Sequence, residues 1–381
     1  MTDRYNAFLH RDDDAVGHDG LLAGVTLGVK ANIAVKGMPF HAGIGAWADR
    51  CADRDAEVVR RLREAGAAIV GILNMEEAAL GAKTDNPHFG PTQNPHREGY
   101  SPGGSSGGSG AAVAAGLCDV ALGTDTLGSV RIPAAHCGVF GFKPATDRVS
   151  QDGLIPADPT LDAIGPLARD LDLLERVGRV ISDFGNCELN GGGAVLAEHG
   201  VDLHPAVERA FSQAIAARDQ QPTSTTLDAP LGRIRYAAFI QVSRNLAKHL
   251  RGVPISNHLS QLLTYGPDRP ADKWEHDRRL LTQTKEQVRK IVARHGFLIL
   301  PTVPNPPFPH SETEPAAQAD FTCLANIAGL PAMSIPVGWT GDGLPIGIQV
   351  VGAAGAEAGL FAIARHLDQT LRAYRAPKEG A

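Results

Sequence analysis

The stretch PGGSSGGSG, residues 102–110, is the part of this chain that most strongly decides the fold. The small-residue run that continues to residue 117 predicts a helix buried by close backbone packing, and residues 120–122 predict a short strand after it. A glycine-rich loop that opens a helix presents backbone N–H groups to a ligand. Loop, helix and strand in this order are typical of an α/β protein, and they disfavour the alternative in which the Gly/Ser run is a flexible linker.

A second serine motif, GTDTLGSVR at residues 123–131, follows directly. Residues 126–129 supply consecutive backbone N–H groups at a tight turn, which suits the stabilisation of a developing oxyanion. Upstream, in GVKANI at residues 28–33, Lys30 ends an apolar, strand-like run. That position favours a buried, neutral amine over the usual surface lysine. Two serines and a lysine suffice for nucleophilic amide hydrolysis without histidine or metal.

The rest of the chain repeats the α/β pattern at both ends. Strands are predicted at 25–29, 67–73, 138–143, 297–300, 332–337 and 345–351, and helices at 55–65, 319–328 and 356–373. Between them lies a mainly helical excursion at about 185–296, with helices near 205–219, 237–264 and 272–295. We therefore expect residues 1–381 to form one α/β domain. Its core would be a large twisted mixed β-sheet with helices on both faces, covered by the excursion.

Composition narrows the classes of function. A formal net charge of −6 argues against a nucleic-acid partner. Five scattered cysteines without a CxxC pair suit a reducing compartment. Without a signal-like N-terminal segment or an apolar run of membrane-spanning length, we expect a cytoplasmic protein with no membrane contact. The absence of an HExxH-type cluster predicts no metal, and we expect no cofactor.

A rival catalytic motif overlaps the first serine stretch. Residues 104–108 match G-x-S-x-G, which would make Ser106 a nucleophile on a strand-to-helix elbow. That motif needs a buried strand before Gly104 and an acid and a histidine downstream. Residues 98–102 are polar and interrupted by proline, and no downstream histidine has a recognisable catalytic context. This hypothesis is therefore disfavoured.

Taken together, the motifs resemble those of the amidase signature family, the Ser-cisSer-Lys amidohydrolases. The matching segments cover roughly residues 21–185 and 297–370. They are GVKANI (28–33), GILNMEE (71–77), GPTQNP (90–95), PGGSSGGSG (102–110), GTDTLGSVR (123–131), PAA (133–135), GFKP (141–144), NIAGLPA (326–332) and LPIGIQ (344–349).

The resemblance implies a role for each motif residue. Ser129 would be the nucleophile, Ser105 the bridging serine on a cis peptide bond after Gly104, and Lys30 the base. The N–H groups of Thr126, Leu127, Gly128 and Ser129 would bind the oxyanion. Ser106 would join the hydrogen bonds around Lys30, while Asp125 and Arg131 would hold the nucleophile loop.

Three features depart from the family pattern. Leu127 stands where a glycine is common, so its side chain either points away from the pocket or narrows it. Ala31 replaces a frequent acidic residue. The chain is also short for the family, which puts the covering of the pocket and the dimer contacts in doubt.

The apolar Ile132 favours a neutral primary amide, cleaved to a carboxylate and ammonia by an amidase acting through a Ser129 acyl-enzyme. We predict that Met75, Gly104 and Ile132 line the pocket. We expect a homodimer that acts on a small-molecule amide, without nucleic acid or membrane. Alternatives are a glutamine amidotransferase subunit of a tRNA-dependent complex, a ureide hydrolase of the biuret or allophanate type, and a non-catalytic binding subunit.

Overall fold

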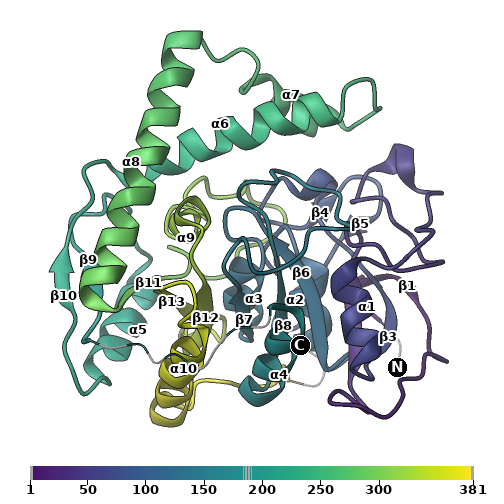
Figure 1. Cartoon of the computed structure of the whole chain (residues 1–381), viewed down its shortest axis with the longest axis horizontal. Coiled ribbons are helices and arrows are strands. Elements are labelled where there is room, and N and C mark those ends of the chain that lie inside the picture. The colour runs from purple at the N-terminus through teal and green to yellow at the C-terminus, as the bar shows by residue number, and fades with distance from the viewer. Residues whose placement is uncertain (1–2, 183, 185–186, 188, 190, 379–381) are drawn as a thin grey trace.

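A large mixed β-sheet forms the centre of the molecule (Figure 1). The computed structural model describes residues 3–182, 184, 187, 189 and 191–378. Over these residues the sheet has 11 strands in the order β1-β3-β2-β6-β8-β7-β12-β13-β11-β9-β10. The strands are β1 (Phe8–Arg11), β2 (Thr26–Lys30), β3 (Ala68–Leu73), β6 (Val120–Asp125), β7 (Phe140–Lys143), β8 (Ala163–Ala168), β9 (Ala194–Leu196), β10 (Thr223–Thr225), β11 (Phe297–Pro301), β12 (Ala332–Trp339) and β13 (Pro345–Gly352). The predicted α/β fold with a mixed sheet is confirmed.

Helices cover both faces of the sheet. On one face lie α2 (Gly107–Ala114) and α3 (Arg131–Cys137), and on the other lie α1 (Glu57–Glu64), α4 (Leu171–Ser182), α5 (Pro205–Ala216) and α10 (Glu357–Leu371). Side chains of β6 alternate accordingly, because Ala121 packs with α2 while Val120 and Leu122 pack with the opposite core. The small residues of α2 allow a close approach, since a Cβ on Gly108 would meet the Asn74 carbonyl oxygen at 2.4 Å.

The direction of two strands positions the site. Strand β2 is parallel to β6, with Leu27 opposite Val120 and Val29 opposite Leu122. Parallel strands end at the same edge of a sheet. Lys30, the last residue of β2, therefore lies at the same edge as the loop that follows β6.

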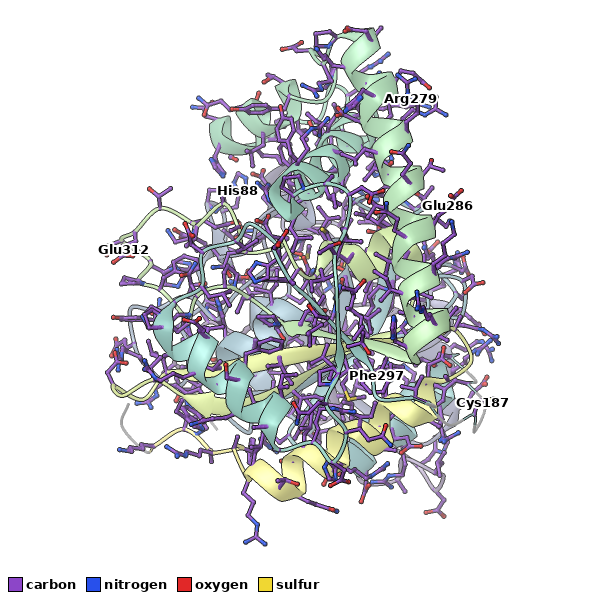
Figure 2. The ribbon with its side chains drawn as sticks, turned by 90° about the vertical axis from the view of Figure 1, so that its left-hand side faces the viewer. His88, Cys187, Arg279, Glu286, Phe297 and Glu312 are labelled. Carbon is purple, nitrogen blue, oxygen red and sulfur yellow. The ribbon has the colours of Figure 1, made fainter. Side chains whose placement is uncertain are left out.

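The region 185–296 contains two short strands beside its helices. Its helices include α6 (Leu231–His249), α7 (Asn257–Thr264) and α8 (Ala271–His295), which stand beyond the sheet in Figure 1. Figure 2 labels Arg279 and Glu286 on α8, and both lie far above Phe297, the first residue of β11. However, β9 and β10 of this region extend the sheet edge. The expected start near residue 185 falls outside the described residues.

The helix predicted at 237–264 is two helices, α6 and α7. Gly252 adopts a positive φ of 78° between them, and Pro254 follows, so the chain turns where a single helix was expected. The short helix α9 (Cys323–Ala328) returns the chain to the sheet.

Candidate active site

Lys30 is buried at the end of β2 and faces three hydroxyl groups. Its Nζ donates hydrogen bonds of 2.8 Å to the Oγ atoms of Ser105 and Ser106 and to Thr124 Oγ1. Burial lowers the pKa of Lys30 to about 7, although the nearby carboxyl groups of Asp162, Asp125 and Glu76 oppose the shift. The neutral form of the amine is therefore accessible near pH 7, and in that form the Nζ lone pair can accept a proton from a serine hydroxyl.

The glycine-rich loop delivers Ser105 to this lysine. The Gly104–Ser105 peptide bond is cis, as the resemblance implied, and the Ser105 side chain is fully buried. Gly104 packs against the main chain of the loop at residues 82–83, where a Cβ would approach Ala82 C to 2.7 Å. Gly104 thus shapes the loop, and it is not among the residues that line the cavity beside Ser129, which corrects its assignment to the pocket.

The loop between β6 and α3 carries Ser129. None of the backbone N–H groups of residues 126–129 donates to an acceptor among the described residues. Gly128 has a φ of 136°, and a Cβ there would meet Thr322 Oγ1 at 2.2 Å. The Ser129 carbonyl accepts a 3.3 Å hydrogen bond from Ser106 N, which ties this loop to the glycine-rich loop. The N–H groups are free to bind a ligand oxygen.

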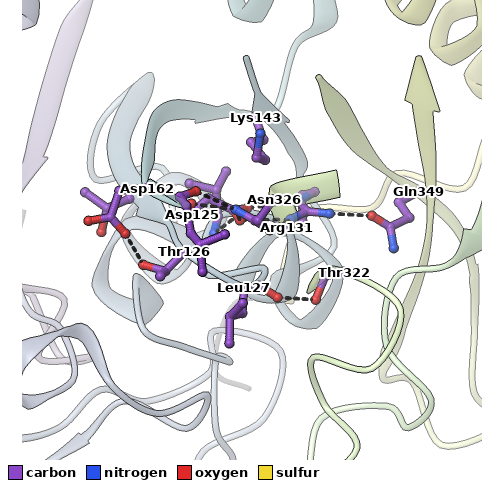
Figure 3. Close-up of polar contacts among 12 residues, drawn as sticks. Asp125, Thr126, Leu127, Arg131, Lys143, Asp162, Thr322, Asn326 and Gln349 are labelled. Carbon is purple, nitrogen blue, oxygen red and sulfur yellow. Dashed lines mark hydrogen bonds and ion pairs between the residues drawn. The ribbon is translucent and has the colours of Figure 1, made fainter. Parts of the chain in front are cut away.

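A buried ion pair joins Asp125, which precedes the loop of Ser129, to Arg131, which follows it. Arg131 donates to both carboxylate oxygens of Asp125, at 2.9 Å through Nε and 2.8 Å through Nη2 (Figure 3). The guanidinium also donates to Gln349 Oε1 at 2.6 Å and to Asn326 Oδ1 at 2.7 Å. The ion pair holds the pKa of Asp125 down at about 2 despite its burial. Both sides of the loop are fixed to the C-terminal part of the chain.

Two further hydrogen bonds hold this loop, one through a side chain and one through the backbone, and no sequence motif predicted either of them. Thr126 Oγ1 donates to Asp162 Oδ1 at 2.6 Å, and Thr322 Oγ1 donates to the Leu127 carbonyl at 2.6 Å (Figure 3). Asn326 and Gln349 lie in motifs that were recognised without a role, whereas Asp162 and Thr322 lie in no motif.

A cavity of about 380 Å³ opens at Ser129. Its lining combines apolar and aromatic residues with a smaller number of polar and charged ones. It comprises Ala79, Leu80, Gly81, Ala82, Thr126, Leu127, Ser129, Ile132, Arg235, Tyr236, Phe239, Val242, Leu262, Tyr265, Glu314, Ala316, Gln318 and Ala319. Ile132 and Leu127 both belong to this lining. A larger cavity, about 670 Å³, lies beside α10 and includes none of the predicted site residues.

Met75 lies elsewhere, which corrects its assignment to the pocket. Its side chain is fully buried in the hydrophobic core and is not part of the cavity lining. The segment that follows it, from Ala79 to Ala82, forms that wall instead.

The cavity lining contains a guanidinium that the sequence analysis did not place. Arg235 of α6 donates to Asp320 Oδ1 at 2.6 Å, and burial raises the pKa of Asp320. The preference for a neutral substrate rested on the apolar Ile132 next to Arg131. Arg235 reaches the same cavity from a distant segment of the chain. Within the described part of the chain, no cluster of three or more His, Cys, Asp or Glu side chains is arranged to hold a metal ion.

A buried lysine that contacts serine hydroxyls, beside a loop whose N–H groups have no acceptor among the described residues, is an arrangement suited to nucleophilic hydrolysis. The family model described as Amidase matches residues 9–186 and 187–361. The chain belongs to the amidase signature family.

Several proteins that are similar to this chain carry the name of an amidotransferase subunit. The chain is 35% identical to a subunit of glutamyl-tRNA(Gln) amidotransferase of Natronomonas pharaonis, over 94% of this chain and 98% of the relative. The crystal structure of a glutamyl-tRNA(Gln) amidotransferase subunit from Thermotoga maritima matches with a TM-score of 0.87 at 28% identity, over 98% of this chain and 91% of that one. A chain from a vestigial protein complex that reveals the origins of an s-triazine catabolic enzyme matches with the same TM-score and identity, over 98% and 93%.

These similarities contradict our expectation about partners. We expected a homodimer without nucleic acid that acts on a small-molecule amide. The amidotransferase relatives are subunits of an enzyme named for a tRNA substrate, and a further neighbour belongs to a protein complex. The net charge of one chain does not determine what an assembly containing such a chain binds, so the charge of −6 alone does not exclude partners of this kind. Among the described residues, no helix has the length and apolar character needed to cross a membrane.

Proposed function

We propose that this chain cleaves a primary carboxamide through a Ser129 acyl-enzyme, and that glutamine is its ammonia-releasing substrate within a multisubunit amidotransferase. The observation that carries the proposed chemistry is the 2.8 Å contact between Lys30 Nζ and Ser105 Oγ. It supplies a base that is partly neutral near pH 7 at the start of a proton path to Ser129.

The reaction follows from these groups. Neutral Lys30 takes the proton of Ser105, and Ser105 takes that of Ser129, whose Oγ attacks the amide carbon. The oxyanion accepts hydrogen bonds from the N–H groups of residues 126–129. Ser105 then returns a proton to the leaving nitrogen, ammonia departs, and water releases the acyl group.

The charged wall of the cavity favours glutamine. Arg235 lines the cavity and binds Asp320 through Nε, so its Nη groups would be the donors to the α-carboxylate of an amino acid. The relatives named as subunits of an amidotransferase support the same choice. We therefore expect full activity to depend on partner subunits, as the names of these relatives suggest.

The aromatic wall favours a second candidate, a small neutral amide with an alkyl or aryl acyl group. Tyr236, Phe239 and Tyr265 line the cavity, and the rings of Phe239 and Tyr265 meet edge to face. A flat or apolar acyl group would pack against these rings.

Ammonia release distinguishes the candidates. The chain would be assayed with L-glutamine, butyramide, benzamide and biuret, beside Ser129→Ala and Lys30→Met. We expect the highest kcat/KM with glutamine and its loss in both variants. A preference for benzamide or butyramide would select the second candidate. Activity that survives in Ser129→Ala would refute the acyl-enzyme mechanism.

A further inference from the structure

Gln318 is a buried polar residue of the cavity wall that the mechanism does not use. Its side chain is 1% exposed, and neither Oε1 nor Nε2 has a hydrogen-bond partner among the residues that the structure describes. Its backbone is held, because Gln318 N donates to the Pro315 carbonyl at 3.2 Å. A buried amide without partners is costly, and native proteins rarely keep one without a reason.

The neighbouring charged groups of the wall are already partnered. Arg235 donates to Asp320, and Glu314 Oε2 accepts the Ala82 N–H at 2.9 Å. Gln318 lies two residues before Asp320, on the segment that leads to the Thr322 contact with the nucleophile loop. Gln318 and Arg235 both line the cavity that contains Ser129, and the buried amide of Gln318 has a donor and an acceptor that no described residue uses.

We infer that Gln318 is a substrate-binding residue that recognises a hydrogen-bonding group on the acyl chain of the substrate. Its Oε1 accepts from a donor on that group, and its Nε2 donates to an acceptor. The inference rests on the proposed function for the location of the substrate. It narrows the substrates to amides whose acyl chain carries both a donor and an acceptor, such as an α-amino acid head group or a second carboxamide. Simple alkyl amides would leave Gln318 unpaired and bind less well.

Binding to an inactive background tests this inference without turnover or partner subunits. Calorimetric titrations of Ser129→Ala with L-glutamine, succinamide and butyramide would be compared with Ser129→Ala/Gln318→Leu. Gln318→Met serves as a second apolar variant in case the leucine variant fails to fold. Gln213→Leu, which removes an exposed glutamine of α5 outside the cavity lining, is the matched control. We expect each Gln318 variant to raise the Kd of glutamine or succinamide at least tenfold, while the Kd of butyramide changes less than twofold.

The possible outcomes separate the two proposals. If glutamine does not bind but the preference for succinamide over butyramide depends on Gln318, the inference holds and glutamine is excluded as substrate. If glutamine binds and is hydrolysed while the Gln318 variants keep the preference, the inference fails and the proposed function stands. Equal weakening of all three ligands would indicate a structural role and overturn the inference, as would failure of both polar ligands to bind Ser129→Ala.

Discussion

The lysine at the centre of the site makes activity depend on pH. Lys30 acts as a base only when neutral, and burial lowers its pKa to about 7. Its neutral fraction rises with pH, so we expect kcat/KM to rise about fivefold between pH 6 and pH 7 and to level off above pH 8. A pH–rate profile with the preferred amide measures this rise in kcat/KM, the acidic limb of the profile.

Lys143 provides a control for that profile. Burial also lowers the pKa of Lys143 to about 7, but its Nζ donates to the carbonyls of Pro144 and Leu330 and not to a serine. Lys143→Met is expected to keep the limb near pH 7. If the rise in kcat/KM disappears in Lys143→Met, the pH dependence comes from Lys143 and not from Lys30.

Gly128 is a residue whose replacement should affect activity strongly. An alanine Cβ would collide with Thr322 Oγ1, and the φ of 136° disfavours any L side chain. We expect Gly128→Ala to lower kcat/KM about 100-fold or more, because the N–H groups for the oxyanion would move. Gly252→Ala, which also has a positive φ but has no atom within 4 Å of its Cβ, should retain activity. Equal activity of the two variants would argue against this role for the loop.

At the scale of elements, α9 supports the nucleophile loop from outside it. Thr322, at the start of α9, donates to the Leu127 carbonyl. We expect Thr322→Val to lower kcat about tenfold or more with a small change in KM, since the loop would lose an anchor. Thr302→Val removes a buried hydroxyl contact to Ser334 instead and is the matched control. Similar kinetic losses in both variants would point to a general packing defect.

Elements that lie within short, contiguous motifs were predictable from sequence, whereas the substrate pocket was not. The strand ending at Lys30 and the helix opening at Gly107 follow from local patterns of apolar and small residues. Arg235 lines the cavity from α6, and Gln318 lines it from the loop before α9. No local sequence pattern predicts that these two distant segments line the same cavity. Long-range packing decides which residues line the pocket, and this is why Met75 was assigned to it although its side chain lies in the core.

At the scale of the whole molecule, one buried hydrogen-bond network joins the first half of the chain to its C-terminal part. Asp125 and Arg131, from the first half, are bonded to Asn326 and Gln349, which lie near the C-terminus. A buried charge that loses its partner is expensive. We expect Arg131→Met to lower the free energy of unfolding by about 3–5 kcal/mol, measured by urea denaturation.

The double variant Asp125→Leu/Arg131→Met shows whether this loss comes from the unpaired charge. Removing both charges leaves no uncompensated carboxylate, so the double variant should be less destabilised than the sum of the two single variants. Its activity should still be low, because Asp125 Oδ2 also accepts the Val130 N–H next to the nucleophile. Recovered stability without recovered activity would therefore separate the charge balance of the core from the positioning of Ser129. Strict additivity would mean that the two residues stabilise the fold independently, and it would remove the ion pair as the link between the two halves of the chain.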